Sequence, residues 1–245
     1  MRGFLTALTF LTRIPLPASK FIVTSEDIER SYPYYPLVGL FLGLILWLLG
    51  KVLYSFFPPL VLGSLLLSTE LLLTGGLHLD GFMDSMDGLL SARTPERVLE
   101  IMKDSRVVAH ACISLVSILV LKFTLLASLT PAKFSLLLVM PMLSRWVFQF
   151  AVIRYPYARQ QGLGKGLHDN ARWLPFLLSG SIVLGLTFLL IGYAGIIAFI
   201  TCTLTVIFMS HKVSKLLGGL TGDIYGALIE ISEVVCLLAA FPFLR

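Results

Sequence analysis

The sequence is poor in charged residues. Only 13% of its 245 residues are Asp, Glu, Lys or Arg, whereas these residues make up about 25% of a typical soluble domain. Hydrophobic residues account for 57% of the chain. This composition excludes an intrinsically disordered chain, a basic arm that binds nucleic acid and an ordinary soluble enzyme. We therefore expect an integral membrane protein in which residues 1–245 form a single membrane-embedded domain.

Cysteine is also scarce, and the hallmarks of three other protein classes are missing. The three cysteines lie in apolar runs without a Cys-x-x-Cys pair, so we expect neither a disulfide framework nor a cysteine metal site. No Ala-x-Ala cleavage site follows the N-terminal residues, which argues against a removed signal peptide. No internal repeat is visible, so the sequence does not suggest a transporter built from inverted repeats.

Long apolar runs are what the sequence contains instead. A helix needs about 20 mostly apolar residues to cross a bilayer, and the need to pair backbone groups in lipid makes such runs helical. Seven runs qualify: Leu37–Phe57, Leu60–Leu77, Val107–Leu129, Ser135–Ile153, Trp173–Ile191, Tyr193–Met209 and Ala227–Leu244. Pro58-Pro59 and Gly192 predict tight turns between neighbouring runs. The expected fold is all-α, a polytopic membrane protein with about seven transmembrane helices and short cytoplasmic helices.

Seven crossings place the termini on opposite faces and separate the charges. The face that holds the N-terminus carries 14 of the 19 Lys and Arg residues, and no Asp or Glu falls in a loop on the other face. The positive-inside rule makes the crowded face cytoplasmic. We therefore expect a multi-pass protein of the cell (inner) membrane whose chemistry takes place on its cytoplasmic side.

The densest group of acids follows the second run. Asp80, Asp84 and Asp87 stand at positions i, i+4 and i+7 after Gly75-Gly76. On a helix these carboxylates share one face, where they repel one another unless a cation neutralises them. Mg²⁺ suits carboxylate oxygens and often bridges to phosphates. The glycines that follow two of the aspartates favour close approach of a ligand to the backbone. The alternative is an acidic helix face neutralised by neighbouring Arg and Lys.

A short helix is expected to lead from this group to a second one. Thr94 is predicted to be its N-cap and Pro95 its first residue. The following segment, Lys103-Asp104-Ser105-Arg106, combines two cations, a hydroxyl and a carboxylate, which suits a phosphate and a metal ion. A basic stop at the membrane surface also explains Arg106, but it leaves Asp104 unexplained.

A third candidate site lies in a loop rich in aromatic residues and glycine. Arg159 follows two tyrosines and precedes Gly162 and Gly164. Such a loop can bind a phosphate or a flat ligand. The alternative is a flexible basic loop whose aromatic residues lie at the membrane interface.

The last apolar run begins with a fourth group of acids. Asp223, Glu230 and Glu233 stand at positions i, i+7 and i+10 and share one helix face. Ionisable residues within membrane spans are costly and are usually functional or paired. These acids therefore either bind a ligand or form an internal salt bridge.

Three other ionisable residues fall within the apolar runs. Glu70 and Arg145 lie near the middle of their runs, so we expect them to pair with each other or with another buried group. Lys122 is expected to snorkel toward the outer face. His78, two residues before Asp80, is expected to orient a carboxylate or contact a phosphate.

Together these motifs resemble those of a known family. Gly75–Gly88 reads Gly-Gly-Leu-His-Leu-Asp-Gly-x-x-Asp-x-x-Asp-Gly and is followed by Leu-Glu-Ile-Met-Lys-Asp-Ser-Arg at residues 99–106. Both look like cobalamin synthase, the adenosylcobinamide-GDP ribazoletransferase family. Its other motifs are similar to Thr12–Pro17, Tyr35–Gly39, Tyr157–Arg159, Gly162–Gly164 and Gly219–Asp223. The chain departs from the family at Val108 and Ala111, where glycines are usual.

The resemblance implies a reaction. A hydroxyl of α-ribazole, or of its 5′-phosphate, attacks the cobinamide-side phosphorus of adenosylcobinamide-GDP, GMP leaves, and adenosylcobalamin or its phosphate forms with the help of Mg²⁺. Phosphoryl transfer requires mainly positioning and charge neutralisation. We expect the metal ligands to be Asp80, Asp84, Asp87 and Asp104, and the catalytic residues to be Asp84, Lys103, Asp104 and Arg106, with Asp104 a ligand or the general base. The expected substrate-binding residues are His78, Ser105, Arg159, Gly162, Gly164, Asp223, Glu230 and Glu233.

The sequence also indicates possible partners and two alternative functions. Membrane lipid is an expected partner, and the sequence leaves open a homo-oligomer or a complex with other cobalamin-pathway enzymes. A CDP-alcohol phosphotransferase is one alternative, but Met83-Asp84 stand where its Ala-Arg pair belongs. A transporter that uses the buried ionisable residues is the other, and the bare outer face argues against it.

Overall fold

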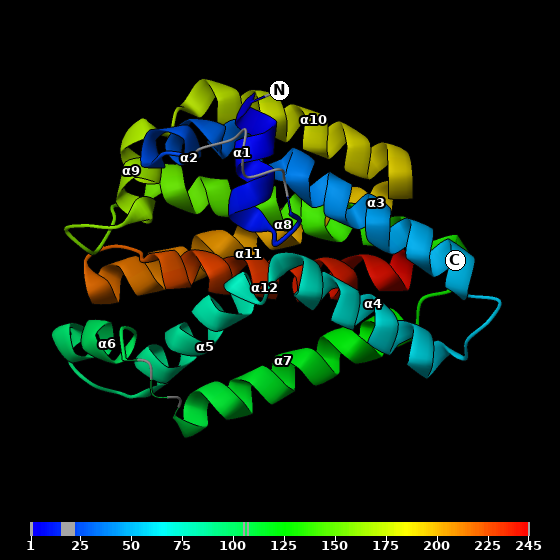
Figure 1. Ribbon diagram of the computed structural model, residues 1–245, viewed down its shortest axis with the longest axis horizontal. Helices are drawn as coiled ribbons and strands as arrows, with labels where there is room; N and C mark the ends of the chain where they lie inside the picture. Colours follow the sequence, from blue (N-terminus) through cyan, green and yellow to red (C-terminus); the bar gives the residue numbers. More distant parts are fainter. Residues whose placement is uncertain (1, 16–22, 105, 107, 245) are drawn as a thin grey trace.

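The computed structural model describes residues 2–15, 23–104, 106 and 108–244, and it is built from helices (Figure 1). Ser105, Val107 and the end of the Thr12–Pro17 motif lie outside the described residues. The helices are α1 (Arg2–Leu11), α2 (Ser25–Ser31), α3 (Tyr35–Leu53), α4 (Pro59–Thr74), α5 (Leu77–Leu90), α6 (Pro95–Ile101), α7 (Ala109–Ala127), α8 (Ser135–Arg154), α9 (Leu163–Asn170), α10 (Trp173–Ile191), α11 (Tyr193–Leu217) and α12 (Gly222–Ala240). The described ranges contain no strand beyond one isolated bridge, which confirms the all-α prediction.

Six described segments are long and apolar enough to cross a membrane. They contain α3, α7, α8, α10, α11 and α12, and the pair α4–α5 passes the same test jointly although its axes differ by 89°. The described residues therefore contain six helices able to cross a membrane, or seven if the bent pair counts as one span, in agreement with the predicted multi-pass protein. Helix α4 begins at the end of the molecule where α3 finishes, and α5 continues toward the opposite end (Figure 1).

Two glycines make the bend between α4 and α5. Gly75 and Gly76 have φ angles of 62° and 70°, a left-handed conformation that side chains with a Cβ atom disfavour. Hydropathy alone predicted a straight second span from Leu60 to Leu77. The structure corrects this prediction, because α4 ends at Thr74 and the acidic segment starts a separate helix in a new direction.

Local signals set several other helix ends close to where the sequence predicted them, but α11 ends at Leu217, eight residues beyond the predicted Met209. Pro58 precedes α4, Gly192 with φ 59° separates α10 from α11, and α6 starts at Pro95 after Thr94. Helix α12 starts five residues earlier than the apolar run at Ala227. The Thr221 hydroxyl accepts a hydrogen bond from the Ile224 amide and caps this helix, so a polar first turn extends it beyond the part that hydropathy detects.

Helices α8 and α12 form the centre of the molecule. About 83% of the apolar stretch that contains α8 is buried and 72% of that containing α12, against 22–39% for the other four spans. Glycines let α3 approach α8 closely, since a Cβ atom at Gly43 would lie 2.6 Å from the Leu137 carbonyl oxygen. Small residues at helix contacts are typical of membrane proteins.

A buried ion-pair cluster joins four of these helices. Lys122 of α7 pairs with Glu70 of α4 at 3.1 Å and with Glu230 of α12 at 3.2 Å, and it also contacts Glu233, which pairs with Arg145 of α8. The prediction that Glu70 and Arg145 pair with buried groups is confirmed. The prediction that Lys122 snorkels outward was wrong: its side chain is 1% exposed, because three carboxylates compensate its charge inside the protein.

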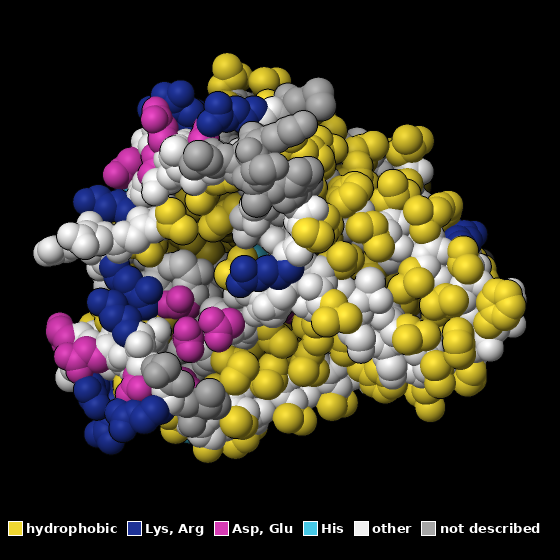
Figure 2. All heavy atoms as spheres, in the orientation of Figure 1, with side chains coloured by type: hydrophobic (Ala, Val, Ile, Leu, Met, Phe, Trp, Pro, Cys, Tyr) yellow, Lys and Arg dark blue, Asp and Glu magenta, His cyan; other side chains and the backbone are white. Residues whose placement is uncertain are grey.

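Charged side chains gather at one end of the molecule (Figure 2). We call this region, where α2, α5, α6 and α9 lie, the charged end (Figure 1). The remainder of the visible face is mostly hydrophobic, as lipid-facing surface is expected to be. The candidate site therefore has to be sought at the charged end.

Candidate active site

One cavity at the charged end collects the acidic and basic motifs. It has a volume of about 290 Å³, and we call it the polar cavity. Helix α5 presents its three aspartates to this cavity, as the i, i+4, i+7 spacing predicted, and the segment after α6 closes it from the other side. The charged lining residues are Asp80, Asp84, Asp87, Lys103, Asp104 and Arg106. Two motifs separated in the sequence thus form one site.

Asp87 uses its carboxylate to cap helix α7. One carboxylate oxygen accepts the amide of Val108 at 2.9 Å, and the other accepts the amide of Ala111 at 2.7 Å. These amides belong to the N-cap residue and the first turn of α7, where amides lack partners within the helix and attract negative charge. The contacts are made by the backbone, so the departure from glycine at Val108 and Ala111 leaves them intact.

Asp104 is paired with Arg106. The two side chains approach to 2.6 Å, and the Arg106 amide also donates to the same carboxylate. These hydrogen bonds lower the pKa of Asp104 to about 2, so this carboxylate is a weak base. Lys103 and the Arg106 side chain are exposed, which leaves their cationic groups accessible to an anion.

Asp80 and Asp84 differ from the other two carboxylates of the polar cavity. Neither side chain makes a hydrogen bond or an ion pair with any described residue. They lie one turn apart on α5, so they concentrate negative charge without a neutralising partner. Their arrangement favours a bound cation.

The glycines that follow Asp80 and Asp87 pack against other helices. A Cβ atom at Gly81 would lie 3.0 Å from the Asp223 Cα atom of α12, and one at Gly88 would lie 3.1 Å from the Val98 carbonyl oxygen of α6. The sequence analysis attributed both glycines to the approach of a ligand. Close helix contacts also require glycine at both positions. Gly81 in addition lines a second cavity, where a ligand can approach it, whereas Gly88 lines neither cavity.

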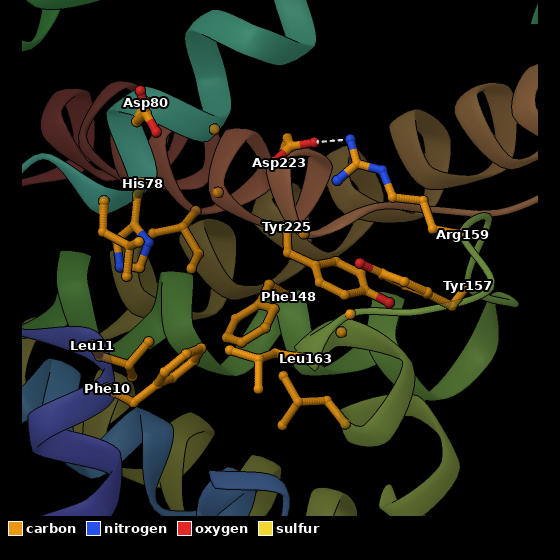
Figure 3. A pocket seen from close by; sticks show the side chains of 18 residues that line it. Phe10, Leu11, His78, Asp80, Phe148, Tyr157, Arg159, Leu163, Asp223 and Tyr225 are labelled. Carbon is orange, nitrogen blue, oxygen red and sulfur yellow. Dashed lines mark hydrogen bonds and ion pairs between the residues drawn. The ribbon is translucent and has the colours of Figure 1, made fainter. Parts of the chain in front are cut away.

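A second cavity of about 350 Å³ adjoins the first (Figure 3). We call it the aromatic cavity. Asp80 lines both cavities, so they meet at this residue. The aromatic cavity also contains most of the remaining predicted binding residues, namely His78, Arg159, Gly162, Gly164 and Asp223.

A short backbone bridge holds the Arg159 loop in place. The amide of Ala158 donates to the Leu220 carbonyl and the amide of Leu220 donates to the Pro156 carbonyl, each at 2.8 Å. The bridge brings Arg159 to the start of α12, where its guanidinium pairs with the Asp223 carboxylate at 2.6 Å. This loop is thus fixed by main-chain contacts, in contrast to the flexible loop considered as an alternative.

Aromatic side chains form much of the second cavity, and sequence reasoning missed most of them. Tyr225 of α12 lies between Tyr157, with ring centroids 6.3 Å apart, and Phe148 of α8, at 6.0 Å. Phe10 and Leu11 of α1 complete the opposite wall (Figure 3). Tyr157 belongs to a recognised motif, but nothing in the sequence separates Phe148 or Phe10 from ordinary core residues. For Tyr225, the closeness of Asp223 in the sequence is the signal that could have indicated a position in the cavity wall.

Two predicted binding residues lie away from both cavities. Glu230 and Glu233 are not among the lining residues, and they belong to the buried ion-pair cluster. Their contacts match the internal salt bridge that the sequence analysis left as an alternative.

The donor atoms of the polar cavity can be tested against the expected Mg²⁺. Across the described ranges, no three His, Cys, Asp or Glu side chains converge on one point as in an all-protein metal site. Mg²⁺ is commonly held by one or two carboxylates together with waters and substrate phosphates. Asp80 and Asp84 supply hard oxygen donors of that kind, beside cations that suit a phosphate. The residues therefore fit a metal ion that binds with its phosphate substrate.

Comparison with known proteins gives a consistent result. The cobalamin-5-phosphate synthase family matches residues 3–241. A protein of Desulfitobacterium hafniense (strain Y51) is 56% identical, covering 100% of this chain and 98% of its own. Proteins of Pseudomonas aeruginosa (strain UCBPP-PA14) and Brevibacillus brevis are 40% and 39% identical, with at least 97% of each chain covered. All three are named adenosylcobinamide-GDP ribazoletransferase.

No solved structure matches the chain. The family match covers nearly the whole sequence and includes the motifs that line both cavities. The chain therefore belongs to the cobalamin-5-phosphate synthase family.

Proposed function

We propose that this protein joins adenosylcobinamide-GDP to α-ribazole or its 5′-phosphate at the cytoplasmic face of the cell (inner) membrane. GMP is released, and adenosylcobalamin or its phosphate is formed. The names of the relatives support the substrates. The observation that carries the proposal is that the aspartates of α5 line one cavity at the charged end together with Lys103, Asp104 and Arg106.

The polar cavity would bind the diphosphate of the donor. Lys103 and Arg106 neutralise its negative charge, and Asp80 and Asp84 would hold Mg²⁺ against its oxygens. When bound, the metal ion supplies charge stabilisation as negative charge moves onto the leaving group. Asp87 and Asp104 support this arrangement indirectly, since one caps α7 and the other orients Arg106.

The acceptor would approach from the neighbouring aromatic cavity. Its hydroxyl oxygen forms a bond to the cobinamide-side phosphorus, the bond from that phosphorus to the bridging oxygen breaks, and GMP departs with that oxygen. The transition state of such transfers is loose and makes little demand on a base. The paired carboxylate of Asp104 is therefore not needed as a base, and the hydroxyl proton passes to water in the polar cavity.

The proposal can be tested with purified protein in liposomes. We expect GMP and cobalamin to form in equal amounts from adenosylcobinamide-GDP and α-ribazole with Mg²⁺, and neither to form with EDTA. Product formation that is unaffected by EDTA would contradict the metal assignment. Absence of product from folded protein under both conditions would contradict the reaction itself, and CDP-alcohol substrates would then be assayed.

A further inference from the structure

The aromatic cavity has walls that suit a flat, apolar group. Phe10, Leu11, Phe148, Leu167, Tyr225 and Ile229 contribute to them. Its volume of about 350 Å³ lies at the lower end of the range for small-molecule sites, about 300–1,000 Å³. A two-ring heterocycle fits a space of this size, whereas a corrin macrocycle with its side chains does not.

Three buried polar atoms on residues that line this cavity have no partner among the described residues. His78 is 4% exposed and Tyr225 is 5% exposed. The His78 Nε2 atom, the Tyr225 hydroxyl and the Arg159 Nε atom have no hydrogen-bond partner in the described part of the protein. Buried polar atoms are rarely left unpaired, because the loss of hydration is costly. A ligand with few polar atoms would therefore complete the site.

The charged residues of the cavity lie to one side. In Figure 3, Asp80, Asp223 and Arg159 lie on one side of the two tyrosine rings, and Phe10, Leu11 and Leu163 lie on the other. Asp80 also lines the polar cavity. A ligand in the aromatic cavity would thus direct its polar end toward the place where the diphosphate is expected to bind.

We propose that the aromatic cavity holds the base of the acceptor nucleoside, with its ribose directed toward Asp80. The inference rests on the proposed function. Of the two flat heterocycles in that reaction, the dimethylbenzimidazole of α-ribazole has two methyl groups and one free ring nitrogen. Guanine carries several donors and acceptors around its rings, and the apolar walls formed by Phe10, Phe148 and Ile229 would leave those that point toward them unpaired. The lining therefore selects the benzimidazole.

The test separates the Michaelis constants of the two substrates. The variants are Tyr157→Ala, in a half-buried loop position, and Tyr225→Phe, which removes only the unpaired hydroxyl. Stacking of a base on an aromatic side chain contributes substantially to the affinity for that base. We expect Tyr157→Ala to raise the KM for α-ribazole at least about tenfold and to leave the KM for adenosylcobinamide-GDP within about twofold. Tyr225→Phe is expected to raise the KM for α-ribazole about threefold.

Tyr193→Ala is the matched control, because this tyrosine is 77% exposed on α11 and lines neither cavity. Its kinetics should equal those of the parent protein. An increase in the KM for adenosylcobinamide-GDP alone in the cavity variants would place guanine in the aromatic cavity and overturn the inference.

Equilibrium dialysis of radiolabelled α-ribazole against full-length protein in nanodiscs provides a readout that does not depend on turnover. Weaker binding by Tyr157→Ala than by Tyr193→Ala supports the inference, even if no GMP is released and the proposed reaction fails. If the parent protein forms cobalamin and both cavity variants bind α-ribazole normally, the inference fails and the reaction stands. Circular dichroism before each experiment verifies that the variants are folded.

Discussion

Four aspartates of the polar cavity have different surroundings, and these surroundings suggest different roles. Asp87 caps a helix and Asp104 is bound to Arg106, whereas Asp80 and Asp84 have no side-chain partner among the described residues. A carboxylate whose lone pairs are already engaged is a poorer metal ligand than one that is free. At the scale of single residues, the structure therefore favours Asp80 and Asp84 among the four candidate ligands that the sequence proposed.

Replacing Asp84 by Asn tests this ranking. The substitution keeps the shape of the side chain but removes its charge, so we expect kcat/KM to fall at least about 100-fold at saturating Mg²⁺, as when an electrostatic contact to the transition state is lost. GMP release in liposomes measures the effect. Glu96→Gln, an exposed carboxylate outside the polar cavity, serves as the control and should retain normal activity.

Asp87 is expected to matter for stability first. Asp87→Ala removes both acceptors of the α7 amides and should lower the free energy of unfolding by about 1–2 kcal/mol, the usual cost of losing a helix cap. Asp87→Asn keeps one acceptor and should lose less. Thermal unfolding in detergent measures the difference, and GMP release should fall less in Asp87→Asn than in Asp84→Asn. Equal losses of activity in these two variants would restore Asp87 as a metal ligand.

At the scale of helices, the break between α4 and α5 determines where the aspartates lie. The two left-handed glycines turn α5 by 89° from α4. Without this turn, α5 would continue along α4 and lose its contact with α12, which Gly81 makes possible. The same contact brings His78 and Asp80 close to the start of α12.

Alanine at the two glycines of the bend should have unequal effects. A Cβ atom at Gly76 would meet nothing within 4 Å, so Gly76→Ala should cost only the left-handed strain of about 1–2 kcal/mol. A Cβ atom at Gly75 would also contact the Arg13 side chain, so Gly75→Ala should cost more. Gly185→Ala is the control, because this glycine lies in the middle of α10 with open space around it, and alanine there should be neutral or stabilising. Thermal unfolding of the three variants gives the order.

Most features set by neighbouring residues in the sequence were predicted, whereas features set by contacts between distant segments were not. Both ends of helix α10 were predicted correctly, because the length of the apolar run and Gly192 define them. The shared face of Asp80, Asp84 and Asp87 followed from helical spacing alone. The bend was not predicted, because two glycines beside an apolar run are equally compatible with a loop at its end. The contact of Asp87 with the α7 amides and the position of Phe148 depend on packing between distant segments, which spacing along the chain does not encode.

At the scale of the whole molecule, the buried ion-pair cluster joins helices from both halves of the chain. It contains three carboxylates and two cations, all of them buried. Each of these groups has at least one partner of opposite charge within the protein, although the carboxylates outnumber the cations by one. The cluster holds α4, α7, α8 and α12 together around the site.

Loss of the Lys122 charge should lower the free energy of unfolding more than loss of a surface charge does. Lys122→Met leaves Glu70, Glu230 and Glu233 without their shared cation, and breaking a buried ion pair in this way costs about 3–5 kcal/mol. Lys51→Met, at an exposed position of α3, should cost almost nothing. Unfolding in SDS would measure both. A Lys122→Met protein as stable as the parent would show that the carboxylates are neutral in the membrane.

The position of Asp80 between the two cavities couples them thermodynamically. Whatever occupies the aromatic cavity alters the solvation of a carboxylate that also faces the polar one. By linkage, if the acceptor changes the affinity for a divalent cation by some factor, the cation must change the affinity for the acceptor by the same factor. Calorimetric titration of Mg²⁺ with and without α-ribazole would yield that factor. A value above one would mean that a divalent cation binds more tightly once the acceptor is in place, which would disfavour attack by water on an activated donor that is bound alone.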